Sequence, residues 1–319
     1  MKNLIIYNLQ SIHRFTDYGI KIPLLNERVL ETITCLGQKY EIEESIYEPI
    51  SIIDLALAHD KEFINRVKND PAGVVKQTYE LVDENGNYNR YDPTLTKRPL
   101  EEFILKARLH VRGTYICARK ALESGFCYHL GGGMHHAMSF KPGGFCMFND
   151  LVISLRKLQK NGKIKKAAII DIDCHKGDGS AQITKEDDSI KTFSIHMKDG
   201  WPLDNKDNHD SFIPSDLDIP VDNSTNYLQL LKKGLTDFLK KNCDIDLALV
   251  VHGVDVWEKD VLPSSSGIQL SSSEVLERDL FVYSSLKQLD IPQAWCLGGG
   301  YGEGVSELYL QFLLAREKV

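Results

Sequence analysis

Two aspartates and a histidine follow a short apolar run near the middle of the chain. The run at 167–170 leads into Asp171, and Asp173 and His175 come next at intervals of two residues. In an extended strand, side chains two residues apart point to the same face, so we expect these three groups to leave a buried strand together. Burying unpaired charge is costly, and a divalent metal ion would offset that cost. Aspartate and histidine ligands together suit zinc, iron or manganese.

A helix N-cap or a surface turn is the simpler explanation of the same residues, because aspartate is common in both. The apolar run that precedes Asp171 argues against a plain surface turn. Cys174 would point to the opposite face of the strand, so we expect it to pack in the core rather than to bind metal. We expect the strand histidines His129, His196 and His252 to be structural.

The elements around this motif alternate between apolar strands and amphipathic helices. We expect strands at 4–7, 126–130, 167–174, 191–196, 246–252 and 293–297, and helices at 51–58, 63–67, 103–122, 149–159, 227–239, 271–289 and 305–316. A polar, turn-rich stretch at 83–100 is expected to be a surface loop. Nearly continuous apolar strands separated by helices indicate an α/β fold with an open, mostly parallel sheet covered by helices on both faces. No linker composition divides the chain, so we expect a single catalytic domain over residues 1–319.

The bulk composition excludes several classes of protein. The chain has 319 residues, of which 42% are hydrophobic and 26% charged, as in ordinary globular proteins. Its formal net charge of −7 argues against direct nucleic-acid binding. Seven cysteines without a CxxC pair predict neither a disulfide framework nor a four-cysteine zinc site. With no signal-peptide pattern and no apolar run of about 18 residues, we expect a cytoplasmic protein with no membrane association.

Polar residues capable of catalysis follow four of the predicted strands. Parallel sheets place ligands at the carboxyl ends of their strands, so we expect these residues to converge at one edge. The apolar strand at 126–130 is followed by a histidine pair, the apolar run at 167–170 by the aspartate–histidine motif, and the last two strands by an aspartate and a tyrosine. The residues in chain order are His135, His136, Asp171, Asp173, His175, Asp178, Asp255 and Tyr301.

Convergence of these groups suggests metal-assisted hydrolysis of a carbonyl compound. Asp173, His175 and Asp255 would form a three-ligand site with an open position, as in catalytic zinc sites. Such a metal lowers the pKa of a bound water to roughly 7. His135 and His136 would supply a general base and acid. Two aspartates are left to orient the histidines, namely Asp171 and Asp178. A tyrosine hydroxyl on a glycine-rich turn, that of Tyr301, would donate to a developing oxyanion.

These residues resemble the motifs of the histone deacetylase family. The matching segments are Gly132-Gly-Met-His-His-Ala137, Gly144-Phe-Cys146 with Asn149-Asp150, Asp171-x-Asp-x-His-x-Gly-Asp-Gly179, Gly253-Val-Asp255 and Gly298-Gly-Gly-Tyr301. Within this family, the chain most resembles the short class IV-like and bacterial members. The resemblance implies the arginase/deacetylase fold, with an open sheet of about eight strands and catalytic loops at the carboxyl ends of the strands.

The resemblance also implies a role for each matching residue. Asp173, His175 and Asp255 would bind zinc, with Fe²⁺ as an alternative ion. His136 paired with Asp178 would be the general base and then acid. The electrostatic partner would be His135 paired with Asp171, and Tyr301 would polarise the scissile carbonyl. An acyl-lysine tunnel would be lined by Phe145, Trp201, Gly144 and Gly299. A structural potassium ion would lie near Asp171, Asp173, His175, Ser194 and Ile195.

The activity implied is zinc-dependent hydrolysis of the amide bond of N-acylated lysine. The chain departs from the family pattern at two positions. Lys176 stands where many members have a second histidine, which changes the local charge, and Trp201 is larger than the usual wall residue, which bears on acyl-chain preference. The substrate would be an acylated lysine in a protein or peptide, or an acylated small amine, and a homo-oligomer is compatible with the pattern. Alternatives are an acetylpolyamine amidohydrolase, a long-chain fatty-acyl-lysine deacylase, a binuclear arginase-like hydrolase and a non-catalytic acyl-lysine-binding protein.

Overall fold

A parallel β-sheet forms the centre of the protein. The computed structural model describes residues 4–12, 14–23, 27–39, 42, 44–204 and 213–319. Within them, seven strands pair in the order β1-β2-β7-β6-β3-β4-β5, and every pair is parallel. The strands are β1 (Ile5–Ile6), β2 (Phe126–His129), β3 (Ala167–Asp171), β4 (Ile190–Met197), β5 (Leu217–Val221), β6 (Leu247–His252) and β7 (Gln293–Leu297). The parallel sheet confirms the predicted fold class, with seven described strands where about eight were expected.

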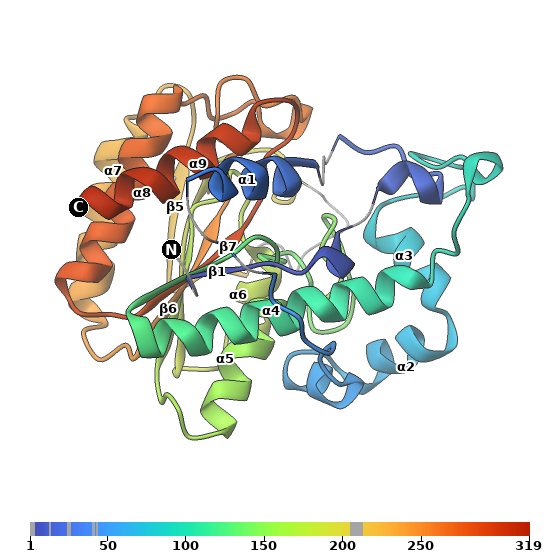
Figure 1. The fold of residues 1–319 in the computed structure, drawn as a ribbon, viewed down its shortest axis with the longest axis horizontal. Coiled ribbons are helices and arrows are strands. Elements are labelled where there is room, and N and C mark those ends of the chain that lie inside the picture. Colours follow the sequence, from blue (N-terminus) through green and yellow to red (C-terminus); the bar gives the residue numbers. More distant parts are fainter. Residues whose placement is uncertain (1–3, 13, 24–26, 40–41, 43, 205–212) are drawn as a thin grey trace.

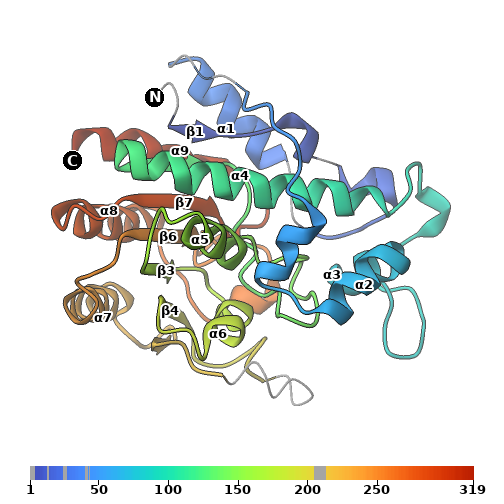
Figure 2. The same cartoon turned by 90° about the horizontal axis from the view of Figure 1, so that it is seen from below.

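Helices cover both faces of this sheet (Figure 1). They are α1 (Glu27–Gly37), α2 (Lys61–Asn69), α3 (Pro71–Thr78), α4 (Glu102–Ser124), α5 (Asp150–Lys160), α6 (Asp178–Thr184), α7 (Tyr227–Lys241), α8 (Ser272–Gln288) and α9 (Val305–Ala315). One hydrophobic core joins the sheet to α1, α7, α8 and α9, and a second joins its other face to α2, α3, α4 and α5. Figure 2 shows α4 running along the sheet towards α2 and α3. Among the described helices, none has the length and hydrophobicity needed to cross a membrane.

Chain topology places side by side the strand before Asp173 and His175 and the strand before Asp255. β3 pairs with β6 from Ala167 opposite Leu247 to Asp171 opposite Val251. Both strands are buried along their whole length, which explains why they are apolar without alternation. β7 then fills the gap between β6 and β2, so the ends of β2, β7, β6 and β3 lie next to one another.

Several predicted elements differ from the structure. The segment expected to be helical at 51–58 forms a 3₁₀ helix at Ile52–Leu57. The strand expected to reach residue 174 ends at Asp171, because the side chain of Asp171 accepts a hydrogen bond from the backbone of Asp173 and turns the chain. β5 was not predicted, since a proline and an aspartate interrupt its apolar pattern, which is typical of an edge strand. Helices α1, α3 and α6 were also not predicted; α6 has only seven residues, too few to show a clear period.

The loop after β2 is held against the end of β7 by backbone contacts. Asp150, wholly buried at the start of α5, accepts hydrogen bonds from the backbone of Gly133 (3.0 Å) and Met134 (2.7 Å). Gly133 has a φ of +71°, and a Cβ added there would lie 1.8 Å from the carbonyl oxygen of Leu297. Only glycine fits this approach, and the histidine pair follows directly.

We expect Gly133→Ala to destabilise the fold and to displace the histidine loop. The left-handed backbone alone costs about 1–3 kcal/mol for a residue with a Cβ, and the contact with Leu297 adds to this. Gly125→Ala is the matched control, because Gly125 has a φ of +78° but no atom within 4 Å of an added Cβ. Urea unfolding of both variants measures the difference. Equal losses of unfolding free energy would show that the contact with Leu297 has no role.

Candidate metal centre and active site

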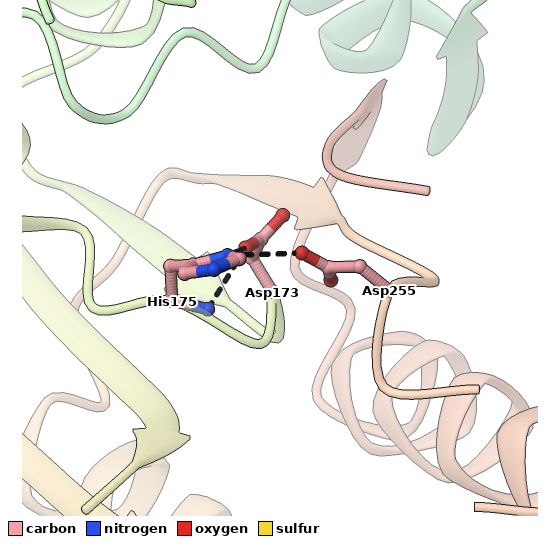
Figure 3. A group of neighbouring side chains, drawn as sticks. All are labelled: Asp173, His175 and Asp255. Atoms are coloured by element: carbon pink, nitrogen blue, oxygen red, sulfur yellow. Dashed lines mark hydrogen bonds and ion pairs between the residues drawn. The ribbon is translucent and has the colours of Figure 1, made fainter. Parts of the chain in front are cut away.

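Asp173, His175 and Asp255 meet beyond the ends of β3 and β6 (Figure 3). His175 Nδ1 lies 3.0 Å from Asp255 Oδ2 and 3.3 Å from Asp173 Oδ1. All three residues are buried, and one donor atom from each lies within 4.8 Å of the others. The first two come from the loop after β3 and the third from the loop after β6, so the parallel pairing of these strands is what brings them together.

Backbone hydrogen bonds orient the two carboxylates. Asp173 accepts from the backbone of His175 at 2.9 Å and from that of Gly299, after β7, at 2.6 Å. Asp255 Oδ1 accepts from the backbone of Cys174 at 3.0 Å. Asp171 does not join the group, because its carboxylate bonds His135 instead. The expectation that three like-facing groups leave one strand is therefore corrected: the strand ends first, and only the second and third groups face Asp255.

The electrostatics of the three residues favour a bound cation. Burial and the charge of Asp173 raise the pKa of Asp255 above its usual value. Burial alone would also raise the pKa of Asp173, but His135 and His175 hold it well below the usual range. For His175, burial acts to lower the pKa, and the two carboxylates nevertheless raise it to about 10. Two buried carboxylates thus retain a proton on the imidazole, and a divalent cation is suited to replace that proton.

Two histidine–aspartate pairs lie next to this group. His135 Nδ1 is 2.6 Å from Asp171 Oδ2, and His136 Nδ1 is 2.7 Å from Asp178 Oδ1. A carboxylate can only accept here, so Nδ1 carries a proton in both rings, and in a neutral ring Nε2 is left to act as a base. The ring centroids of the two histidines are only 3.9 Å apart.

The surroundings of the two histidines shift their pKa values in opposite directions. Burial, together with the charge of His135, lowers the pKa of His136 to about 4. For His135 burial acts in the same direction, but the carboxylates of Asp171 and Asp173 outweigh it and raise the pKa to about 9. Near neutral pH one ring is thus neutral and the other charged, the arrangement that acid–base chemistry needs.

A cavity of about 200 Å³ opens onto these groups. Its lining comprises Glu80, Arg90, His136, Gly144, Phe145, His175, Trp201, Leu262, Ser264 and Tyr301. The edge of Trp201 meets the His136 ring at a centroid distance of 4.5 Å, and Phe145 meets Tyr301 at 6.3 Å. The predicted wall residues Gly144, Phe145 and Trp201 share this cavity. Gly299 lines a smaller adjoining one with His135 and Asp173.

Several residues of the site were missed by the sequence analysis. Glu80 and Arg90 form an ion pair at the cavity, and the Arg90 guanidinium lies 5.4 Å from the centroid of the Phe145 ring. These three residues have positive φ values of 52°, 49° and 63° without being glycine, a conformation that residue type does not reveal. Ser264 Oγ lies 3.1 Å from His175 Nε2. Asp260 accepts a hydrogen bond from the Tyr301 backbone at 2.8 Å.

Two residues predicted to lie near a potassium ion are found on β4, the strand next to β3. Ser194, on β4, pairs with Asp171 in the sheet, and Ile195 follows it. The Ser194 hydroxyl is buried and has no hydrogen-bond partner among the described residues.

Lys176 stands where many family members have a second histidine. Its ammonium is buried 2.6 Å from Asp218 and does not line the cavity beside His136 and His175.

Comparison with known proteins identifies the class to which this fold and site belong. A solved structure, that of the HDA15 HD domain, superposes with a TM-score of 0.74 over 99% of this chain and 91% of that chain, at 16% sequence identity, and so shares the fold. The family model of the histone deacetylase domain matches residues 23–315. The chain therefore belongs to the histone deacetylase family, as the motifs predicted.

The sequences of three individual relatives are 25% to 34% identical to this chain. An uncharacterized protein of Picosynechococcus sp. is 34% identical over 208 residues, which is 65% of this chain and 66% of that protein. Histone deacetylase 2 of Arabidopsis thaliana is 25% identical over 262 residues, or 81% of this chain and 64% of that protein. The acetoin utilization protein AcuC of Staphylococcus aureus is 27% identical over 279 residues, or 81% and 65%. The chain thus spans just under two thirds of the length of these relatives.

We expect a divalent metal to stabilise the folded chain by binding to the buried side chains of Asp173, His175 and Asp255. At a free Zn²⁺ concentration of 100 times Kd, the gain is about 2.7 kcal/mol, visible as a higher Tm in thermal unfolding. Asp255→Asn should abolish this metal-dependent rise. The exposed Asp237, on α7, provides the control, and Asp237→Asn should keep the full rise. A rise of equal size in Asp255→Asn would place the metal elsewhere.

Proposed function

We propose that this chain is a zinc-dependent amidohydrolase that removes acyl groups from the side-chain nitrogen of lysine. The observation that carries the proposal is the meeting, at one cavity, of a buried aspartate–histidine–aspartate group, two histidine–aspartate pairs and Tyr301. Membership of the histone deacetylase family supports the same chemistry. Neither a binding pocket nor a structural core requires two buried histidines with opposite pKa shifts.

Asp173, His175 and Asp255 are the residues that would hold the metal. Two carboxylates and one imidazole suit zinc, and Fe²⁺ is the alternative. When bound, the ion would polarise the substrate carbonyl and acidify the attacking water. The His175 tautomer fits this role, because Ser264 can accept from Nε2 while Nδ1 faces the two carboxylates.

The acid–base work falls to His136. Its low pKa keeps the ring neutral near pH 7, so it takes a proton from water as the water oxygen bonds to the acyl carbon. The same proton then passes to the departing lysine nitrogen as the carbon–nitrogen bond breaks. Asp178 holds the ring through Nδ1 and stabilises the charged state in between. His135, kept charged by Asp171, stabilises the developing negative charge.

Tyr301 is placed to stabilise the oxyanion. Burial and the nearby carboxylates of Asp255 and Asp173 raise the pKa of its hydroxyl well above the usual value, so it keeps its proton and can donate it in a hydrogen bond. Asp260 fixes the backbone of this residue. The position of the Tyr301 ring is further set by its edge contact with Phe145.

The acyl chain would lie between Phe145 and Trp201. Gly144 keeps this passage open, because a Cβ there would lie 2.3 Å from the Trp201 ring and 2.6 Å from that of His136. The indole is bulky and contacts both His136 and His175, so it limits the width of the passage beside the reacting groups. Acyl-chain preference should therefore depend on Trp201.

We also propose a potassium ion where the end of β3 lies beside β4. The groups that would surround it belong to Asp171, Asp173, His175, Ser194 and Ile195. The buried Ser194 hydroxyl supports the proposal, since a buried oxygen that lacks a hydrogen-bond partner is a fit ligand for a hard cation.

The test is a panel of lysine peptides carrying acyl chains of increasing length, together with acetylated polyamines. Each is assayed with protein reconstituted with zinc or with iron. Turnover of peptides supports the lysine deacylase, and preference for polyamines would assign a small-amine hydrolase. A binuclear hydrolase would show two tightly bound ions per chain. Full turnover by metal-free protein, or none on any acyl amine, would refute the proposal.

We expect Tyr301→Phe to lower kcat by about 10²–10³, because removal of one oxyanion donor typically has this effect. KM and metal content should change little, since phenylalanine keeps the ring that lines the cavity and the proposed metal ligands are unaltered. Steady-state kinetics with metal analysis measures both. Tyr88→Phe, at an exposed tyrosine, is the control and should behave as wild type.

We expect His136→Ala to lower kcat/KM by about 10²–10⁴, the usual contribution of a general base. In the wild type, the rate should stay level from pH 7 to about pH 5 and fall only as His136 gains a proton, because its pKa lies near 4. A pH profile with metal content measured at each point tests this. Wild-type turnover in His136→Ala would assign the base to another residue.

A further inference from the structure

Two consecutive charged residues on α8, Arg278 and Asp279, are completely buried. They line neither of the cavities that open onto the metal group. Buried ion pairs are often no more stabilising than apolar residues of the same size, so burial alone does not explain this pair. Its contacts do suggest an explanation.

The pair contacts both loops that carry the proposed metal ligands. Arg278 Nη1 donates to the carbonyl oxygen of Ile172 at 2.9 Å, and Ile172 lies between Asp171 and Asp173. Asp279 Oδ2 lies 2.8 Å from Nε2 of His252, the last residue of β6 and three residues before Asp255. The two side chains are joined by a bond of 2.8 Å from Arg278 Nε to Asp279 Oδ1.

His252 is held in one orientation within this network. Asp279 can only accept, so Nε2 of His252 carries the proton, and the Tyr128 hydroxyl, 2.8 Å away, donates to Nδ1. Burial lowers the pKa of His252 and keeps the ring neutral. The backbone carbonyl of His252 in turn accepts from Gly298, so both its side chain and its backbone are fixed.

The loops need such a fixed support because the ligands themselves repel each other. Ladder pairing between β3 and β6 ends at Asp171 opposite Val251, before any ligand is reached. Beyond that point, the carboxylates of Asp173 and Asp255 share one small buried group. Repulsion between two charged carboxylates in a dry interior would drive the loops apart unless positive charge compensates it.

We propose that Arg278 and Asp279 form a clamp that sets the spacing between the Asp173–His175 loop and Asp255. They are positioning residues for the metal centre and act through Ile172 and His252. This proposal rests on the proposed function in one respect: it requires that Asp173, His175 and Asp255 bind a metal ion. A guanidinium suits the role, because its planar fork bonds the carboxylate and the carbonyl at once, and an ammonium has no such fork.

The experiment measures metal affinity in Arg278→Lys, Asp279→Asn and His252→Phe. Apo protein is titrated with Zn²⁺ against a chromophoric chelator, and with Co²⁺, whose visible spectrum reports coordination geometry. We expect the dissociation constant for Zn²⁺ to rise at least tenfold in each variant, with an altered Co²⁺ spectrum. At saturating metal, kcat should fall while KM changes less than twofold, because the Phe145 and Trp201 walls are untouched. His252→Phe keeps an aromatic ring and removes the bonds of the imidazole to Asp279 and to Tyr128.

Arg316→Met is the matched control for loss of a buried arginine. Arg316 is also buried, and its guanidinium lies 4.0 Å from the centroid of the Phe126 ring, at the end of β2 remote from the site. It should lower the Tm but leave zinc affinity within twofold of wild type. Wild-type affinity in the folded Arg278→Lys and Asp279→Asn variants would overturn the clamp alone, as would an equal loss in Arg316→Met. A wild-type chain that binds no divalent metal would overturn the proposed function, and the clamp with it.

Discussion

Two buried carboxylates that face each other, Asp173 and Asp255, impose the constraint on which the rest of the site depends. Their donor atoms lie with that of His175 in a group only 4.8 Å across. In a low-dielectric interior such charges repel strongly and are poorly solvated. The arrangement is stable only with compensating positive charge, supplied by a proton on His175 or, as we propose, by a metal ion.

The parallel sheet provides the remaining compensation through its strand ends. Backbone N–H groups of Cys174, His175 and Gly299 donate to the two carboxylates, and they come from the loops after β3 and β7. These loops flank the loop that carries Asp255 because β6 lies between β3 and β7 in the sheet. The same topology brings the histidine pair to the group, where the charge of His135 lowers the pKa of His136. The difference in pKa between the two histidines is thus a consequence of strand order.

Sequence pattern predicted the regular parts of the fold and missed the irregular ones for identifiable reasons. β3 and β6 are buried on both faces, so their apolar runs were clear. β5 lies at an edge and contains Pro220, which hides the strand. The turn at Asp171 was also missed, because an aspartate can continue a strand or bond the backbone two residues ahead, and residue type alone does not decide between them.

By itself the sequence determined which residues would meet, namely the polar groups that follow four apolar strands, because the carboxyl ends of parallel strands share one edge. It also identified the family through the order of those groups. Only the tertiary structure decided how the groups divide: Asp171 turns to His135, whereas Asp173 turns to Asp255. It alone also showed Glu80 and Arg90 at the cavity and the contacts of Arg278 with Ile172. These depend on positive φ values and on partners far apart in the chain, and neither leaves a local pattern in the sequence.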